Sequence, residues 1–266
     1  MRTALYFVLI VWISVLAAQE SGVFFLSRGD FASAASAFEK EGSLASLLSA
    51  AENYELIGES EKAAELYLRY AYKKMGADGG RALIKAALLK NSISGYMPKE
   101  LLEAAREMVE KKRGDAEKRV FAEASYLLAE IEFNHYLDQI TDADGPFCQN
   151  EIIQNIGENN RLDRIYDGIR MLNVPEFNVK SLYRRAFLYI SFAATSCGKA
   201  HFFKENKAER ILYDALMREE TGQISDSASR FLEEAYKESL KISGLDGLRD
   251  MILKTLSKIK ADKYKY

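Results

Sequence analysis

A five-residue pattern that occurs twice, 29 residues apart, restricts the fold of this chain more than any other feature. It consists of a small residue, an aromatic, a glycine, a small residue and an aromatic. The first copy is Gly22, Phe25, Gly29, Ala34 and Phe38, and the second is Ala51, Tyr54, Gly58, Ala63 and Tyr67. Within each copy the first small residue and the aromatic share one helix face, the glycine makes a turn, and the second small residue lets another helix approach closely. The pattern predicts consecutive helical hairpins.

Helical spacing of apolar residues continues along the rest of the chain. Only three prolines occur in 266 residues, and no segment keeps a two-residue alternation between turn signals. Helices are predicted over Phe31–Glu41, Leu44–Ile57, Glu61–Lys74, Ala82–Lys90, Lys99–Lys112, Asp115–Gln139, Val179–Ser196, Lys207–Arg218, Ser225–Ile242 and Leu245–Lys260. The sequence therefore predicts an all-α chain.

The repeated pattern resembles the tetratricopeptide repeat (TPR), which carries the same residue types at the same spacing. The resemblance covers about residues 18–75, with a period of 29 instead of about 34 and no closing proline. It implies a right-handed α-solenoid of antiparallel helix pairs, with divergent helices toward the C-terminus. A third 29-residue step gives Gly80, Leu83, Ala87, Ser92 and Tyr96, and there Gly95 and Pro98 interrupt the pattern.

The N-terminal residues have the features of a secretory signal peptide. Arg2 precedes an uncharged run from Ala4 to Ala18, and small residues allow cleavage after Ala17 or Ala18. The run is shorter than a spanning helix, although an uncleaved anchor remains the alternative. The prediction is an exported protein, periplasmic or extracellular, without a transmembrane span in its mature chain.

Three parts follow from these observations: a signal peptide at 1–18, TPR-like repeats at 19–96 and a divergent helical-repeat region at 97–266. Within the last part, an insertion at about 141–173 is rich in Gly and Asn, and we expect short helices laid against the solenoid there. The insertion either helps to select a ligand at one end of the groove or simply covers exposed core.

The only two cysteines are Cys148 and Cys197. In an oxidising compartment such a pair predicts a disulfide, which would fasten the insertion to the stack of helices. Two buried free thiols are the alternative.

The search for catalytic and metal motifs gives no enzyme, no cofactor and no metal site. His135 lies among aromatic residues and is expected to pack, and His201, near the predicted disulfide, is expected to cap a helix or to pack. Asp142, Asp144 and Glu151 fit part of a calcium loop, but Ile140 occupies its first position, so a turn is expected. The net charge of −2 gives no basis for nucleic-acid binding. The basic stretch Lys241–Tyr266 is either a solvated tail or a contact for an anionic surface.

The function predicted is that of a scaffold or accessory subunit that binds a protein or peptide in the cell envelope. The TPR resemblance implies that the inward positions are Val23 and Leu26 in the first repeat and Glu52 and Glu55 in the second, where a basic or mixed-charge segment docks. Two other functions remain open. One is a small-molecule-binding component of a periplasmic transport system, which requires a closed cavity, and the other is a helical domain of a cell-wall enzyme.

Overall fold

The structure, a computed structural model, describes residues 21–111, 114–141, 149–198, 222 and 225–263. These residues are largely helical and contain no strand, which confirms the predicted all-α class for this part of the chain. Two compact units are formed, one up to Ala124 and the other from Ser125. The predicted signal peptide lies outside the described residues, and none of the described helices is both long and apolar enough to cross a bilayer.

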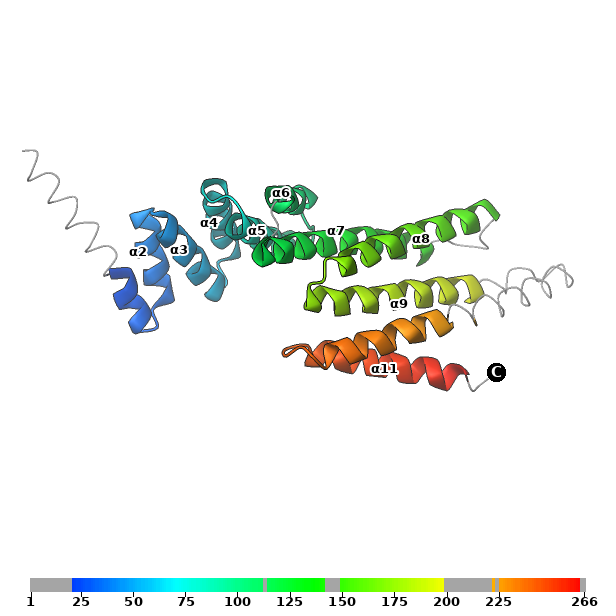
Figure 1. Ribbon diagram of the computed structural model, residues 1–266. Helices are drawn as coiled ribbons and strands as arrows, with labels where there is room; N and C mark the ends of the chain where they lie inside the picture. The colour runs from blue at the N-terminus through cyan, green and yellow to red at the C-terminus, as the bar shows by residue number, and fades with distance from the viewer. Residues whose placement is uncertain (1–20, 112–113, 142–148, 199–221, 223–224, 264–266) are drawn as a thin grey trace, which may run out of the picture. The chain divides into compact units, whose positions relative to one another are not determined.

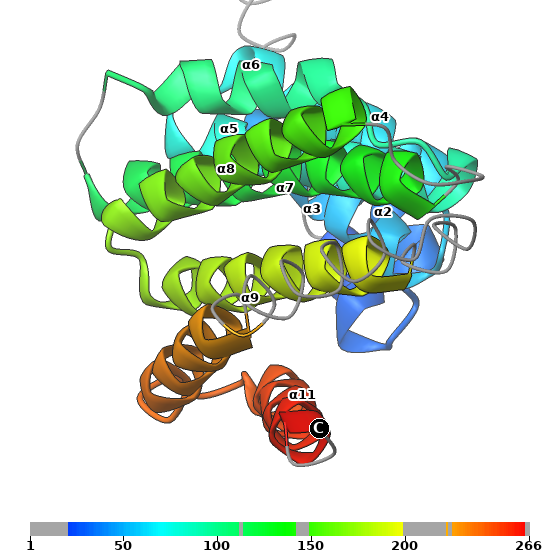
Figure 2. The ribbon, with the colours of Figure 1, turned by 90° about the vertical axis from the view of Figure 1, so that its right-hand side faces the viewer.

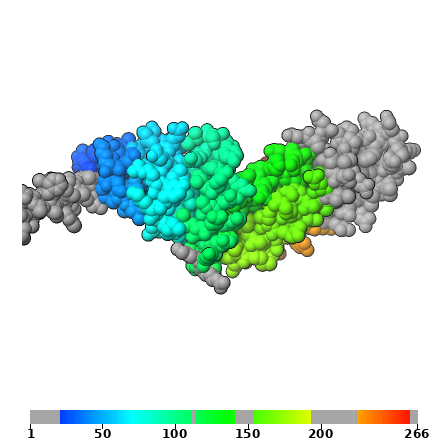
Figure 3. Space-filling view, turned by 90° about the horizontal axis from the view of Figure 1, so that it is seen from above, coloured from blue at the N-terminus to red at the C-terminus, as the bar shows by residue number. Residues whose placement is uncertain are grey.

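The first unit is a succession of helices that pack on their neighbours in sequence. Helical residues 21–27 are followed by α2 (Phe31–Glu41), α3 (Leu44–Leu56), α4 (Ser60–Lys73), α5 (Ala77–Ser94), α6 (Lys99–Val109) and the first part of α7 (Asp115–Thr141) (Figure 1). Each helix from α2 to α5 packs on the next one. Figure 3 shows the same succession on the surface, where the colour passes from blue through cyan to green along this unit.

The two predicted turn glycines end their helices in the same way. Gly29 has a backbone φ of 72° and Gly58 a φ of 80°, values that residues other than glycine rarely adopt. In the first turn the amide of Asp30 donates to the carbonyl of Phe25 at 3.0 Å, and in the second the amide of Glu59 donates to the carbonyl of Tyr54 at 2.9 Å. The repeat is therefore reproduced in the backbone as well as in the sequence.

The small residues of the repeat lie where two helices approach most closely. A Cβ added to Gly22 would lie 2.6 Å from the ring of Phe38, on the second helix of the same hairpin. Ala34, Ala51 and Ala63 have no exposed surface at all. Three of the four repeat aromatics are buried (Phe38, Tyr54 and Tyr67), and Phe25 is half-buried. The predicted hairpin packing is confirmed.

The third copy of the repeat departs from the first two. The predicted start at Ala82 is wrong, because α5 begins at Ala77 and includes Gly79 and Gly80. A Cβ on Gly80 would lie 2.6 Å from Cγ1 of Val120 in α7, so the first small residue again marks a close approach between helices. The helix then continues to a left-handed glycine, Gly95.

The second unit contains the rest of α7, α8 (Gln149–Met171), α9 (Pro175–Gly198), the helical residues 225–239 and α11 (Asp246–Lys263). Figure 2 shows α8 and α9 side by side, and the two helices are in contact. One hydrophobic core joins α9 to the two segments that follow it. Its members are Val179, Leu182, Tyr183, Ala186, Ala228, Phe231, Leu232, Ala235, Leu245, Ile252 and Leu256.

The expectation of short helices in the insertion is wrong over residues 149–171, which form the single helix α8. Its Gly and Asn residues have low helix propensity, but tertiary packing outweighs that preference. Leu162, Tyr166 and Ile169 are buried along one side. The amide of Asn159, also buried, donates to the carbonyl of Leu188 in α9 at 3.2 Å.

We predict that Ala63→Leu lowers the free energy of unfolding by about 1–3 kcal/mol, because the added carbons have no space at this helix contact. Lys73→Leu is the matched control, since Lys73 is exposed near the end of the same helix. Urea unfolding followed by circular dichroism measures both. Equal midpoints for Ala63→Leu and the wild type would show that Ala63 is not at a packed contact.

We predict that Gly168→Ala raises the free energy of unfolding by about 0.5–1 kcal/mol. Gly168 is an exposed residue inside α8, and a Cβ at this position meets no atom within 4 Å. The same substitution at Gly80 should instead destabilise the protein, because the new Cβ would meet Val120. Thermal unfolding compares the two variants, and a loss of stability in Gly168→Ala would contradict the open environment of that residue.

Candidate functional site

The candidate binding surface lies on the first helices of successive hairpins. We call it the groove face and define it by the residues one and four places after each small residue. These are Val23 and Leu26, then Glu52 and Glu55, and, after Gly80, Arg81 and Ile84. The side chains of Val23, Glu52 and Arg81 are exposed, those of Leu26 and Glu55 are half-buried, and that of Ile84 is buried.

Glu55 is held by two neighbouring helices. The phenol of Tyr67 in α4 donates to its Oε2 at 2.7 Å, and the ammonium of Lys85 in α5 donates to its Oε1 at 2.7 Å. Partial burial would raise the pKa of Glu55, but the hydrogen bonds from Lys85 and Tyr67 outweigh it and hold the pKa below its ordinary value. Burial, together with the bond to Glu55, raises the pKa of the Tyr67 phenol. Glu55 therefore remains an anion that ties α3 to α4 and α5.

Next to this ion pair the groove face is hollowed. Arg81, Ile84, Lys85 and Leu88 of α5 line a cleft of about 430 Å³ together with Arg119 and Glu123 of α7. Ile84 and Leu88 supply the apolar part of its lining, and the charged side chains supply the rest. Because Lys85 both lines this cleft and binds Glu55, the cleft continues the surface that the sequence predicts around Glu52 and Glu55.

The charges of this surface differ in sign between two of its helices. Glu52 and Glu55 lie on α3, whereas Arg81 and Lys85 lie on α5, and Lys85 binds Glu55. The sequence prediction stopped at the two glutamates and missed the basic residues. A third application of the 29-residue step, from Glu52 to Arg81 and from Glu55 to Ile84, would have found the α5 positions. Lys85, one helical turn after Arg81, and the two α7 residues do not fall on this 29-residue step, so no sequence signal pointed to them.

A cluster of ionisable groups lies in the second unit. The carboxylate of Glu130 in α7 pairs with the guanidinium of Arg184 in α9 and accepts a hydrogen bond of 2.8 Å from the phenol of Tyr166. Arg185 pairs with Asp163 at 2.8 Å and also with Asp167, both in α8. All of these charges are satisfied within the fold, so the cluster serves to hold α9 against α7 and α8.

The other residues singled out in the sequence are an exposed histidine and several residues outside the described part of the chain. The expectation that His135 packs is wrong, because it is exposed and its Nε2 lies 2.9 Å from the side-chain nitrogen of Gln139. Cys148, His201, Asp142 and Asp144 lie outside the described residues, as does the side chain of Cys197, so the disulfide stays a prediction. Within the described part of the chain, no three metal-ligating side chains come together.

Comparison with known proteins returns few matches. No protein-family model matches the chain, and no curated protein does. Among solved structures, a TPR repeats protein from Bacteroides fragilis is similar to this chain, with 15% sequence identity and a TM-score of 0.45. The alignment covers 93% of this chain and 98% of that one.

We predict that Tyr67→Phe raises the pKa of Glu55 toward its ordinary value of 4.5, because the carboxylate loses one of its two donors. A carboxyl group whose pKa is lower in the folded than in the unfolded state stabilises the fold at pH values above its unfolded pKa. This stabilisation is lost as the pH falls through the folded pKa. The wild type should therefore lose more stability than the variant below about pH 4.5. Carbon-detected NMR titration of the Glu55 carboxyl measures the shift.

The control for this titration is Tyr54→Phe, since the phenol of Tyr54 donates to Glu39 at 3.1 Å and not to Glu55. An unchanged Glu55 pKa in Tyr67→Phe would contradict the hydrogen bond. An equal rise in both variants would point to a general loosening of the hairpins.

Proposed function

We propose that this protein is an exported scaffold or accessory subunit that binds a protein or peptide partner in the cell envelope through the groove face. The observation that carries the proposal is the succession of Glu52, Glu55, Arg81 and Lys85 along neighbouring helices, next to an open cleft. A surface of this kind offers a partner several polar contacts in a row with an apolar lining beside them.

The mixed charges of the groove face favour a partner segment that itself carries both signs. A uniformly basic segment would meet Arg81 and Arg119, and a uniformly acidic one would meet Glu52 and Glu123. Like charges brought together across an interface weaken binding, so the mixed charges of the groove face disfavour both a uniformly basic and a uniformly acidic segment. The partner we propose is therefore a segment with acidic and basic residues spaced to match successive helices.

The compartment in this proposal rests on the N-terminal sequence. The charged start, the uncharged run to Ala18 and the small residues at the cleavage site support export. The same compartment would allow the bond between Cys148 and Cys197. A non-enzymatic role is part of the proposal, since the clustered charges of Glu130, Arg184 and Arg185 form ion pairs that hold helices together.

We predict that exchanging two charges, Glu52→Lys with Arg81→Glu, lowers recovery of the partner at least about tenfold in a pull-down from envelope extract of the native host. The exchange keeps the net charge and leaves the Glu55–Lys85 pair intact. The matched control exchanges Glu107→Lys with Lys111→Glu, two exposed residues that do not line the cleft. Mass spectrometry quantifies the recovered proteins, and circular dichroism verifies that both variants fold.

Two results would contradict the proposal. One is equal recovery of the same partners by the wild type and the groove variant, which would place binding elsewhere. The other is an equal loss in both variants, which would show that binding responds to any rearranged surface charge.

A further inference from the structure

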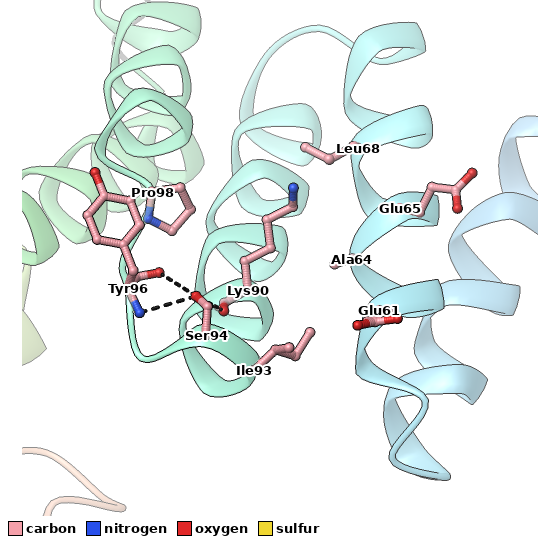
Figure 4. Close-up of a pocket in the computed structure, with 9 residues that line it drawn as sticks. All are labelled: Glu61, Ala64, Glu65, Leu68, Lys90, Ile93, Ser94, Tyr96 and Pro98. Atoms are coloured by element: carbon pink, nitrogen blue, oxygen red, sulfur yellow. Dashed lines mark hydrogen bonds between the residues drawn. The ribbon is translucent and has the colours of Figure 1, made fainter.

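A second cleft, of about 520 Å³, lies in the first unit between α4 and α5. Figure 4 shows its lining residues, with α4 on one side, the last turns of α5 in the middle, and Tyr96 and Pro98 on the other side. From α4 come Glu61, Ala64, Glu65 and Leu68, which recur every three or four residues and so share one helix face. From α5 come Lys90, Ile93 and Ser94.

This cleft is separate from the groove face because it uses the opposite side of α5. Arg81 belongs to the groove face, and Lys90 follows nine residues later. At about 3.6 residues per turn, nine residues make two and a half turns, so the two side chains leave the helix in opposite directions. A ligand in the second cleft therefore does not compete for the surface of the proposed function.

The middle of the cleft is apolar and its shape is fixed by the turn after α5. Leu68 and Ile93 project into the space between the two helices (Figure 4). Gly95 adopts a φ of 70°, and the hydroxyl of Ser94 accepts a hydrogen bond of 3.2 Å from the amide of Tyr96. These constraints hold the Tyr96 ring at the edge of the cleft, where 63% of the residue is exposed. Ile93 is also exposed, so the cleft presents apolar surface that none of the described residues covers.

Among the residues that the structure describes, the charged side chains around this apolar surface have no pairing partner. Nearby, Lys62 pairs with Glu59, and Lys85 pairs with Glu55. By contrast, the side chains of Glu61, Glu65 and Lys90 form no ion pair or side-chain hydrogen bond with any residue that the structure describes. Two carboxylates against one ammonium leave the cleft with an acidic excess.

We propose that this cleft is a second binding site, which takes a segment of a partner protein that carries a large apolar side chain next to Lys or Arg. The apolar side chain fills the space between Leu68 and Ile93 and covers the exposed ring of Tyr96. The basic side chain pairs with the carboxylates of Glu61 and Glu65. The acidic excess selects against an acidic segment, and the apolar floor distinguishes the site from a general cation-binding surface.

The test selects peptides from a random phage-displayed library on the wild-type protein, after subtraction on a Glu61→Lys/Glu65→Lys variant. The variant keeps the groove face, so subtraction removes peptides that bind there. A failure of this proposal therefore differs from a failure of the proposed function, which concerns the groove face alone. Selected peptides should be enriched in Leu, Ile, Phe or Tyr adjacent to Lys or Arg. Fluorescence polarisation with the synthetic labelled peptides then gives the affinities.

The double variant should bind these peptides at least about tenfold more weakly than the wild type, and Ile93→Ser should also weaken binding. Lys90→Glu should strengthen peptide binding, because it removes the one basic side chain of the cleft. Misfolding of the variant would not increase the affinity. The matched control is Glu107→Lys/Glu110→Lys, which makes the same charge change at two exposed residues outside the cleft, one in α6 and one directly after it. It should change the affinity less than about twofold.

The proposal is overturned if subtraction leaves no binding peptide, if acidic peptides are selected, or if the control weakens binding as much as the double variant. It is also overturned if Lys90→Glu and Ile93→Ser leave the affinities unchanged, because the peptides would then bind outside the cleft.

Discussion

The close approach of consecutive helices at small residues is the constraint on which the first unit depends. Gly22 lies against the ring of Phe38, Gly80 lies against Val120, and Ala63 has no exposed surface. A larger side chain at these positions would push neighbouring helices apart. The spacing between hairpins, and with it the distance from Glu52 to Arg81 along the groove face, follows from these contacts.

The parts of the fold that follow from local chemistry could be predicted from the sequence. The turn glycines and buried alanines of the first two hairpins were found because each has a distinctive residue type at a fixed spacing. The long helix α8 was missed because its Gly and Asn residues indicate turns, while the packing that overrides them depends on α9. For the site, the positions of Glu52 and Glu55 could be derived, but not the bond from Lys85, since a pair 30 residues apart depends on the stacking of α3 and α5.

The two units are stabilised by different means. In the first, small, aromatic and aliphatic residues are buried between the helices, and ion pairs such as Glu55–Lys85 lie at the surface. In the second, Arg184 and Arg185 reach carboxylates on α7 and α8 from partly buried positions. Breaking such a pair leaves a charge poorly solvated, so these arginines fix the helices in one arrangement.

The packing of each helix from α2 to α6 on its neighbours in sequence has a mechanical consequence. Little in such an array ties distant parts of the chain together, so tension applied along it would detach one hairpin at a time instead of breaking one global core. The free energy required at each step is that of a single interface. The first unit can therefore lengthen under load in small increments while the hairpins that remain keep their shape.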